Sequence, residues 1–132
     1  MDLSILTPHR KLVESESIDE LFAPGYQGEL NILPNHANFV TKLGTGVLRW
    51  KTGGTWKRAT ISYGLMEIFD GHISVLADVS ELGTDIDVNR AKTAEIKARQ
   101  KIEQGGLDDE NFRKHQLKLE RAVARISANS AG

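Results

Sequence analysis

The sequence contains no cysteine, only three prolines and few aromatic residues. The lack of cysteine excludes disulfide bonds, thiolate zinc sites and thiol nucleophiles, and it fits a reducing compartment. Aromatic residues make up 6% of the 132 residues, which predicts a modest core rather than a deep catalytic cleft. No apolar run approaches the roughly 20 residues that a membrane-spanning helix needs. The first residues lack a basic segment followed by an apolar one, so we expect neither a signal peptide nor a transit peptide.

Charge is nearly balanced over the whole chain but differs between its two parts. The formal net charge is -1, so we expect no nucleic-acid partner. Residues 1–84 carry seven Lys and Arg against ten Asp and Glu, whereas residues 85–132 carry ten against eight. After residue 112 the basic residues face only Glu120, and they are Arg113, Lys114, Lys118, Arg121 and Arg125.

The motifs of common enzymes are missing from the sequence. It has no phosphate-binding Gly-Lys-Ser/Thr loop and no nucleophile elbow. The histidines lie in unrelated segments, so no metal site is predicted; they are His9, His36, His72 and His115. Carboxylate pairs such as Asp108-Asp109 are better explained as helix caps. We therefore do not expect this chain to be an enzyme.

Residues 1–84 predict an antiparallel β-sandwich. Short runs of alternating apolar and polar residues are separated by turn signals about every 8–12 residues, which is typical of a sandwich or barrel. Gly53-Gly54 and Asp70-Gly71 predict hairpin turns, and Gly44-Thr45-Gly46 is expected to end a short strand. A domain of this size is near the lower limit for folding alone, so docking on a partner would help it.

Residues 85–132 contain no proline and predict a helical hairpin. The first helix is expected at Val88–Gln104, ended by Gly105-Gly106. The second is expected to be capped by Asp108 and to end near Ile126, before a frayed tail. Their apolar stripes are Ala91, Ala94, Ala98 and Ile102 on the first, and Phe112, Leu119, Ala122, Val123 and Ile126 on the second. Such thin stripes make the hairpin marginal, so we expect exchange between docked and extended states.

Pro34-Asn35-His36 follows the alternating segment Gly28–Leu33 and forms a polar tip. These residues predict either a tight turn or an exposed loop that contacts another protein. The chemistry of these residues leaves both readings open.

Asp87, Arg90 and Ala91 are spaced to share one helix face. The simplest reading is a local ion pair beside a packing alanine. The same group also suits a nucleotide, since Asp87 could accept hydrogen bonds from adenine or ribose and Ala91 would leave room for a flat base. Arg90 could meet a base or a phosphate, and Arg121 and Arg125 would supply further charge if the hairpin folds back.

The segment Gly28–Ala37, followed by Gly46–Arg49, resembles the epsilon subunit of bacterial and chloroplast F-type ATP synthases. The Gly-Glu-Leu/Ile-x-Ile-Leu-Pro-x-His element is quite specific to that family. Tyr63–Glu67 is similar to its Gly-Gly-Phe-x-Glu strand, with Tyr63 in place of the first glycine. Residues 85–91 are similar to the start of its helical hairpin. The resemblance covers essentially the whole chain, and the missing transit peptide favours a bacterial protein.

The resemblance implies a β-sandwich of about ten strands, then two helices, in a non-catalytic rotor subunit of the central stalk. It implies contact with the gamma subunit and with the ring of c subunits, the latter through Glu29, Pro34, Asn35 and His36. It also implies that the hairpin can extend and inhibit hydrolysis at the catalytic alpha/beta head. The inhibitory face would then be basic, comprising Arg113, Lys114, Lys118, Arg121 and Arg125. The implied location is peripheral, on the cytoplasmic face of the bacterial plasma (inner) membrane.

Some members of that family bind ATP in the folded hairpin through Ile/Leu-Asp-x-x-Arg-Ala. The matching residues are Ile86, Asp87, Arg90 and Ala91, and the resemblance adds Glu81, Arg121 and Arg125. Lys97 stands where the best ATP binders have Arg, and Lys lacks the planar fork, so we expect weak ATP binding if any. No cofactor is required. The alternatives to an inhibitory rotor subunit are an ATP-sensing module and a free-standing adaptor.

Overall fold

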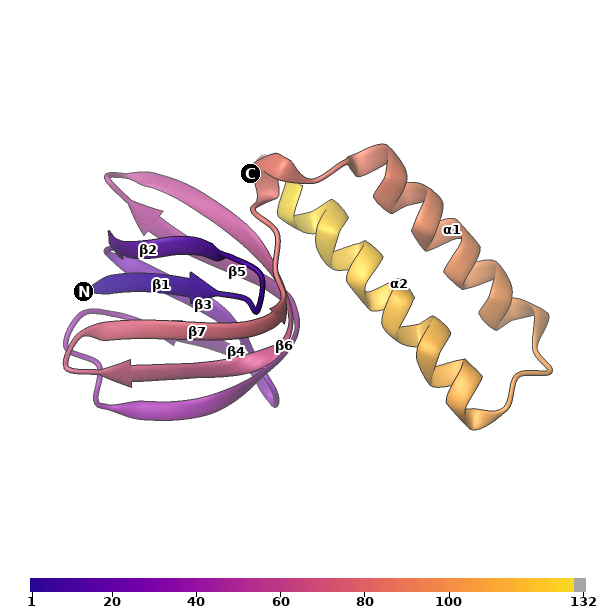
Figure 1. Cartoon of the computed structure of the whole chain (residues 1–132), viewed down its shortest axis with the longest axis horizontal. Helices are drawn as coiled ribbons and strands as arrows, with labels where there is room; N and C mark the ends of the chain where they lie inside the picture. Colours follow the sequence, from indigo (N-terminus) through magenta and orange to yellow (C-terminus); the bar gives the residue numbers. More distant parts are fainter. Residues whose placement is uncertain (130–132) are drawn as a thin grey trace.

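The computed structural model describes residues 1–129, which form seven strands followed by two helices (Figure 1). The strands are β1 (Asp2–Leu6), β2 (Lys11–Ser17), β3 (Glu20–Gly25), β4 (Gly28–Ile32), β5 (Phe39–Thr52), β6 (Thr55–Phe69) and β7 (His72–Val79). A short 3-10 turn, η1 (Gly83–Asp85), leads to α1 (Val88–Gln104) and α2 (Asp109–Asn129).

The strands form one sheet in the order β2-β1-β7-β6-β5-β3-β4. Only β1 and β7 pair in parallel; the other neighbouring strands within residues 1–129 are antiparallel. The sheet folds over, so that β1 and β2 lie in front of β3 and β4 in Figure 1. Residues from both ends of the sheet, such as Leu3 and Ile32, therefore share one core with the fully buried Trp50. The predicted β-sandwich is confirmed.

The number of strands within residues 1–129 is seven rather than about ten, and β5 and β6 are long, with 14 and 15 residues. Gly44-Thr45-Gly46 lies inside β5 and does not end it. The pairing runs from Leu43↔Gly64 to Thr45↔Ser62, which skips one residue on each strand. Tyr63, the skipped residue on β6, has a φ of 53°. The pairing is interrupted there without a change of register, and both strands continue past the point where the sequence predicted an end.

The helical hairpin begins as predicted, and α1 has the expected limits. Gly105 ends α1 with a φ of 69°, in the left-handed region that glycine adopts most readily. Asp108 caps α2, since its Oδ1 accepts a hydrogen bond of 2.8 Å from the Asn111 N–H. The helix continues to Asn129, beyond the expected end near Ile126, because Ala128 is buried against Gly83. Residues 130–132 of the predicted tail lie outside the described residues.

The inner faces of the hairpin are made of small residues. The buried ones are Ala91 and Ala98 on α1, and Ala122, Ala124 and Ala128 on α2. The predicted stripe on α2 is partly wrong, because Phe112 and Val123 are each 42% exposed. Helix α2 packs between α1 and the strands β5 and β6 of the sandwich, and alanine lets it approach both closely (Figure 1).

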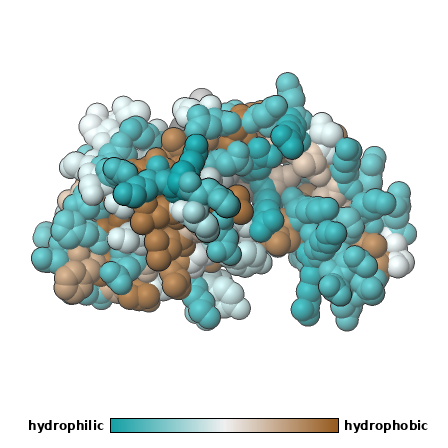
Figure 2. Space-filling view, viewed as in Figure 1, coloured by the Kyte–Doolittle hydropathy of each residue, from teal (hydrophilic) through white to brown (hydrophobic). Residues whose placement is uncertain are grey.

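The two parts of the molecule differ in surface character. Figure 2 shows apolar residues gathered over the sandwich and mainly hydrophilic residues over the hairpin. On the sandwich, Leu65 of β6 and Leu76 of β7 are direct cross-strand neighbours, and both side chains are exposed. Phe69 and Val40 are also exposed. An uncovered apolar sheet face of this kind is typical of a surface that packs against another protein.

Candidate functional site

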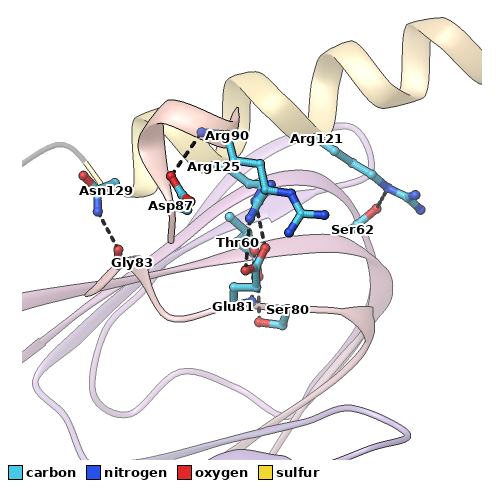
Figure 3. A network of polar contacts seen from close by, with 10 residues as sticks. All are labelled: Thr60, Ser62, Ser80, Glu81, Gly83, Asp87, Arg90, Arg121, Arg125 and Asn129. Atoms are coloured by element: carbon cyan, nitrogen blue, oxygen red, sulfur yellow. Dashed lines mark hydrogen bonds and ion pairs between the residues drawn. The ribbon is translucent and has the colours of Figure 1, made fainter. Parts of the chain in front are cut away.

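The segment between β7 and η1 is fixed on β6 and presents Glu81 to the hairpin. Ser80 Oγ donates to the Thr60 carbonyl at 2.6 Å, and the Glu81 N–H donates to Thr60 Oγ1 at 3.0 Å. The Thr60 N–H in turn donates to the Glu81 carbonyl at 2.8 Å. These bonds hold the Glu81 carboxylate beside Arg125 of α2, with Arg125 Nε 2.8 Å from Oε1 and Nη2 donating to Oε2 at 3.3 Å (Figure 3).

Two further polar contacts hold α2 on the sandwich. Arg121 Nε donates to Ser62 Oγ at 2.7 Å, and Asn129 Nδ2 donates to the Gly83 carbonyl at 2.9 Å (Figure 3). Arg121, Arg125 and Asn129 are spaced four residues apart, so they lie on one face of α2. These three side chains are called the docking clamps below. The spacing of Arg121 and Arg125 could be predicted from the sequence, but the sandwich residues that they contact could not.

A cavity of about 490 Å³ lies beside the clamps, between the hairpin and the sandwich. Its volume is in the range of small-molecule sites. Its polar lining comes from three places: Lys97 and Lys101 of α1; His115, Lys118, Arg121 and Arg125 of α2; and Thr45, Thr60, Ser62 and Glu81 of the sandwich. Five Lys and Arg residues thus surround the space, and Glu81 is the one carboxylate among the described lining residues. The walls between these side chains are mainly apolar, so the space would suit a ligand that carries both apolar and anionic groups.

Four of the eight residues predicted for a nucleotide site line this cavity, namely Glu81, Lys97, Arg121 and Arg125. The other four do not. Ile86 and Ala91 are buried, so the Ala91 methyl group packs inside the docked hairpin instead of leaving room for a base. Asp87 Oδ1 accepts from the Arg90 N–H at 3.1 Å, so Asp87 caps α1. In Figure 3 the Arg90 side chain extends from the first turn of α1 toward the Arg125–Glu81 pair.

His115 was not predicted to belong to any site, but it lies on the wall of the cavity and is half-buried. Desolvation lowers the pKa of its imidazole, and the positive charges of Lys118, Lys114 and Lys101 lower it further. Thr45 is a second lining residue that the sequence did not reveal, and its buried hydroxyl has no hydrogen-bond partner among residues 1–129.

The turn predicted to face the c-ring lies at the end of the sandwich away from the hairpin. Asn35 has a φ of 69°, and the His36 N–H donates to the Leu33 carbonyl at 3.2 Å. Residues 34–36 are exposed and lie beside Met1 and Gly71, near the amino terminus in Figure 1. Glu29 is exposed on β4 and lies 3.7 Å from Arg49 Nη2. All four predicted residues are therefore accessible.

The residues predicted as an inhibitory face do not form one free surface in the docked hairpin. Arg113 and Lys114 are exposed. Lys118 lines the cavity, and Arg121 and Arg125 contact the sandwich. Presenting all five residues together requires α2 to leave the sandwich.

Both parts of the chain match models of known protein families. Residues 1–83 match a family model described as "ATP synthase, Delta/Epsilon chain, beta-sandwich domain". Residues 84–129 match one described as "ATP synthase, Delta/Epsilon chain, long alpha-helix domain". Among residues 1–129, no helix is long and apolar enough to span a membrane.

Similar full-length relatives are bacterial. The ATP synthase epsilon chain of Desulforamulus reducens is 44% identical over 126 residues, covering 96% of this chain and 94% of that relative. The ATP synthase epsilon chain of Syntrophomonas wolfei is 43% identical over 128 residues, covering 96% and 92%.

Solved structures share the fold at low sequence identity. A chain in the cryo-EM structure of the Euglena gracilis mitochondrial ATP synthase (OSCP/F1/c-ring) matches with a TM-score of 0.85 and 20% identity, covering 98% of this chain and 81% of that one. A chain in the Tetrahymena thermophila mitochondrial ATP synthase central stalk/c-ring structure matches with a TM-score of 0.67 and 10% identity, covering 98% and 96%.

Proposed function

This chain belongs to the ATP synthase delta/epsilon chain family, and we propose that its helical hairpin is a detachable arm that restrains ATP hydrolysis. Its relatives are bacterial epsilon chains, so it is the epsilon subunit of an F-type ATP synthase, an accessory and not a catalytic subunit. The family and fold class expected from the sequence are thereby confirmed. The action of the arm, its partners and its ligand are the proposal.

The observation that carries this proposal is the separation of the hairpin from the core of the sandwich. The buried core cluster is drawn from residues 3–77, with Met1 and Leu82 among the partly buried residues at its margin. The hairpin is held instead by alanine contacts and by the three docking clamps. It can therefore leave the sandwich without opening the core.

The proposed inhibitory state follows from what undocking would release. Arg121 would lose Ser62 and Arg125 would lose Glu81, so both would join Arg113, Lys114 and Lys118 on a free basic helix. Such a helix suits an acidic surface on the catalytic alpha/beta head. At the end of the sandwich away from the hairpin, the Pro34-Asn35-His36 turn is available for the c-ring, and Glu29 is exposed on β4.

We assign the exposed apolar sheet face around Leu65 and Leu76 to the gamma subunit. The chain would then sit on the cytoplasmic face of the bacterial plasma membrane, held there by the complex. The accessible turn at one end and the arm at the other support this orientation.

The test compares the assembled ATP synthase with a complex whose epsilon chain ends at residue 87. We expect the truncated complex to assemble normally and to hydrolyse ATP several-fold faster. A second complex with the arm present but Arg113, Lys114 and Lys118 changed to Gln should show an intermediate rate. Equal hydrolysis by the truncated and complete complexes would rule out an inhibitory arm.

A second function, ATP sensing, is favoured by the cavity between hairpin and sandwich. The ligand's phosphates would lie among Lys97, Arg121 and Arg125, and it would bridge the two parts of the molecule. Because a ligand stabilises the state that binds it, ATP would hold the arm in the docked position and oppose inhibition. The two proposed functions are thus two states of one arm.

Calorimetric titration of ATP into the complete chain tests this second function. We expect weak binding with the wild type and loss of the heat with Arg121→Gln. Lys42→Gln, an exposed change on β5 that does not line this cavity, is the matched control. The absence of heat at millimolar ATP would exclude the sensor.

A further inference from the structure

His115 is the one histidine among the described residues that line the cavity, and the same cavity is lined by five cationic side chains. Lys97 and Lys101 reach the space from α1, while Lys118, Arg121 and Arg125 accompany His115 on α2. Lys114, also on α2, acts on it electrostatically. The sandwich contributes hydroxyl groups and a single carboxylate, Glu81.

The single carboxylate does not offset this charge at His115. Glu81 is already paired with Arg125 through both carboxylate oxygens. In the empty docked hairpin, a proton on the imidazole would add a further positive charge to a partly desolvated cluster of cations. Burial and the neighbouring lysines accordingly lower the pKa of His115 below its ordinary value of about 6.5.

A polyphosphate in the cavity would reverse this balance. Its negative charges would lie among the lysines and arginines that line the cavity, and they would attract an imidazolium at the wall. We propose that His115 is a proton-linked ligand group of this cavity, which takes up a proton from solvent when a nucleoside triphosphate binds. The inference rests on the proposed ATP site and adds a residue and a proton to it.

The protonation of His115 changes hairpin docking and ligand binding in opposite directions. Without ligand, the docked hairpin is favoured while His115 is neutral, so docking weakens as the pH falls from about 6.5 through the lower docked pKa. With ligand, the pKa of His115 is raised, so binding tightens over the same pH range. Lowering the pH therefore weakens docking of the ligand-free hairpin and strengthens ligand binding to the docked hairpin.

The decisive measurement is an NMR titration of the histidine ring protons in the complete chain, with and without saturating ATP. We expect the pKa of His115 to rise on ATP binding, while the pKa of His72, which lies outside the cavity lining, stays constant. A rise of one pKa unit would correspond to a tenfold change in Kd, since each unit is about 1.4 kcal/mol.

Calorimetry with His115→Gln provides the matching functional readout. ATP itself titrates near neutral pH, and the comparison with this variant cancels that contribution. We expect the wild-type Kd to fall by a further factor of about three to ten between pH 8 and pH 6 relative to the variant. If ATP binds but neither the His115 pKa nor this ratio changes, the proton linkage is overturned and the ATP site stands. If ATP gives no heat at either pH, both proposals fail together.

Discussion

Arg125 of α2 and Glu81 of the sandwich form an ion pair whose closest atoms, Nε and Oε1, are 2.8 Å apart. The side chains are 24% and 33% exposed, so the pair is partly shielded from solvent. Hydrogen bonds between Thr60 and residues 80 and 81 hold the segment that carries the Glu81 carboxylate on β6. Since both residues also line the cavity, the pair holds the hairpin and contributes to the candidate ligand site.

Glu81→Gln should shift the hairpin toward the undocked state. Loss of a partly exposed ion pair costs at most about 1 kcal/mol, or roughly a fivefold change in the docking equilibrium. Faster hydrogen exchange at the amides of α2, with unchanged exchange in β6, would report it. Glu120→Gln, an exposed change on α2, is the control. If Glu81→Gln and Arg125→Gln give additive effects in a double-mutant cycle, the pair does not contribute to docking.

Gly83→Ala should release the arm while leaving the sandwich folded. A Cβ at this position would lie 2.4 Å from the Ala128 carbonyl oxygen and 3.3 Å from that of Arg58, so two backbone segments would have to separate. Overpacking of this kind costs about 1–3 kcal/mol. In the assembled complex we expect slower ATP hydrolysis, and truncation after residue 87 should abolish the difference.

The control for this substitution is Gly44→Ala, where the nearest neighbouring atom would be 3.8 Å from the new Cβ. Equal hydrolysis rates for Gly83→Ala and wild type, with normal exchange in α2, would mean that the helix end adjusts without leaving. An equal decrease in the rate of ATP hydrolysis with Gly44→Ala would point to a general folding defect.

Lys97→Arg should strengthen ATP binding. Lys97 lines the cavity as a compact charge, and an Arg side chain would offer a planar fork that can make two hydrogen bonds to one phosphate. We expect the Kd from calorimetry to fall by about three- to tenfold, or roughly 1 kcal/mol. Lys92→Arg, an exposed change on the same helix that does not line the cavity, should leave the Kd unchanged. Tighter ATP binding by both variants would indicate a nonspecific attraction between ATP and arginine.

Both ends of α1 and the start of α2 were predictable because local chemistry sets them. Asp87 and Asp108 cap the two helices through hydrogen bonds to residues three positions on, and Gly105 ends the first. The strands were less predictable because their glycines serve tertiary contacts. A Cβ on Gly46 would lie 2.8 Å from Pro24 Cβ, and one on Gly64 would lie 2.2 Å from the Leu76 carbonyl oxygen. Both glycines permit close packing inside long strands, although Gly46 was predicted to help end a short strand.

The candidate site was predictable only as far as helical spacing reaches. Arg121 and Arg125 face the same way by their spacing, and a folded hairpin brings the end of α2 near the start of α1. Which face of α1 turns toward the cavity depends on how the two helices pack. That packing buries Ala91 and directs Lys97 and Lys101 to the space, which spacing alone does not specify.

The pKa of His72 should fall when Asp2 is changed to Asn. His72 Nδ1 lies 2.7 Å from Asp2 Oδ2, and this hydrogen bond and the carboxylate charge raise the pKa of the imidazole. The pair therefore supports the parallel β1–β7 pairing at pH values below the ordinary histidine pKa, and its contribution is lost as the pH rises through the raised value. This dependence has the opposite sign to that of His115. NMR titration measures both residues in one experiment, and Asp70→Asn, which removes a weaker neighbouring charge, should shift the pKa of His72 less than Asp2→Asn.

Glu29→Lys and His36→Trp should weaken attachment of the chain to the membrane-bound rotor. Both positions are exposed, so neither change should unfold the sandwich. Charge reversal at Glu29 would also repel Arg49, now its partner at 3.7 Å, so Glu29→Gln is needed to separate loss of that pair from repulsion by the c-ring. Retention of the chain on washed membranes should fall several-fold with Glu29→Lys and His36→Trp, and less with Glu29→Gln.

Glu14→Lys, an exposed charge reversal on β2, controls for net charge. Because the turn lies away from the hairpin, truncation after residue 87 should not alter these losses. Normal retention of Glu29→Lys and His36→Trp would reduce Pro34-Asn35-His36 to a tight turn without a partner.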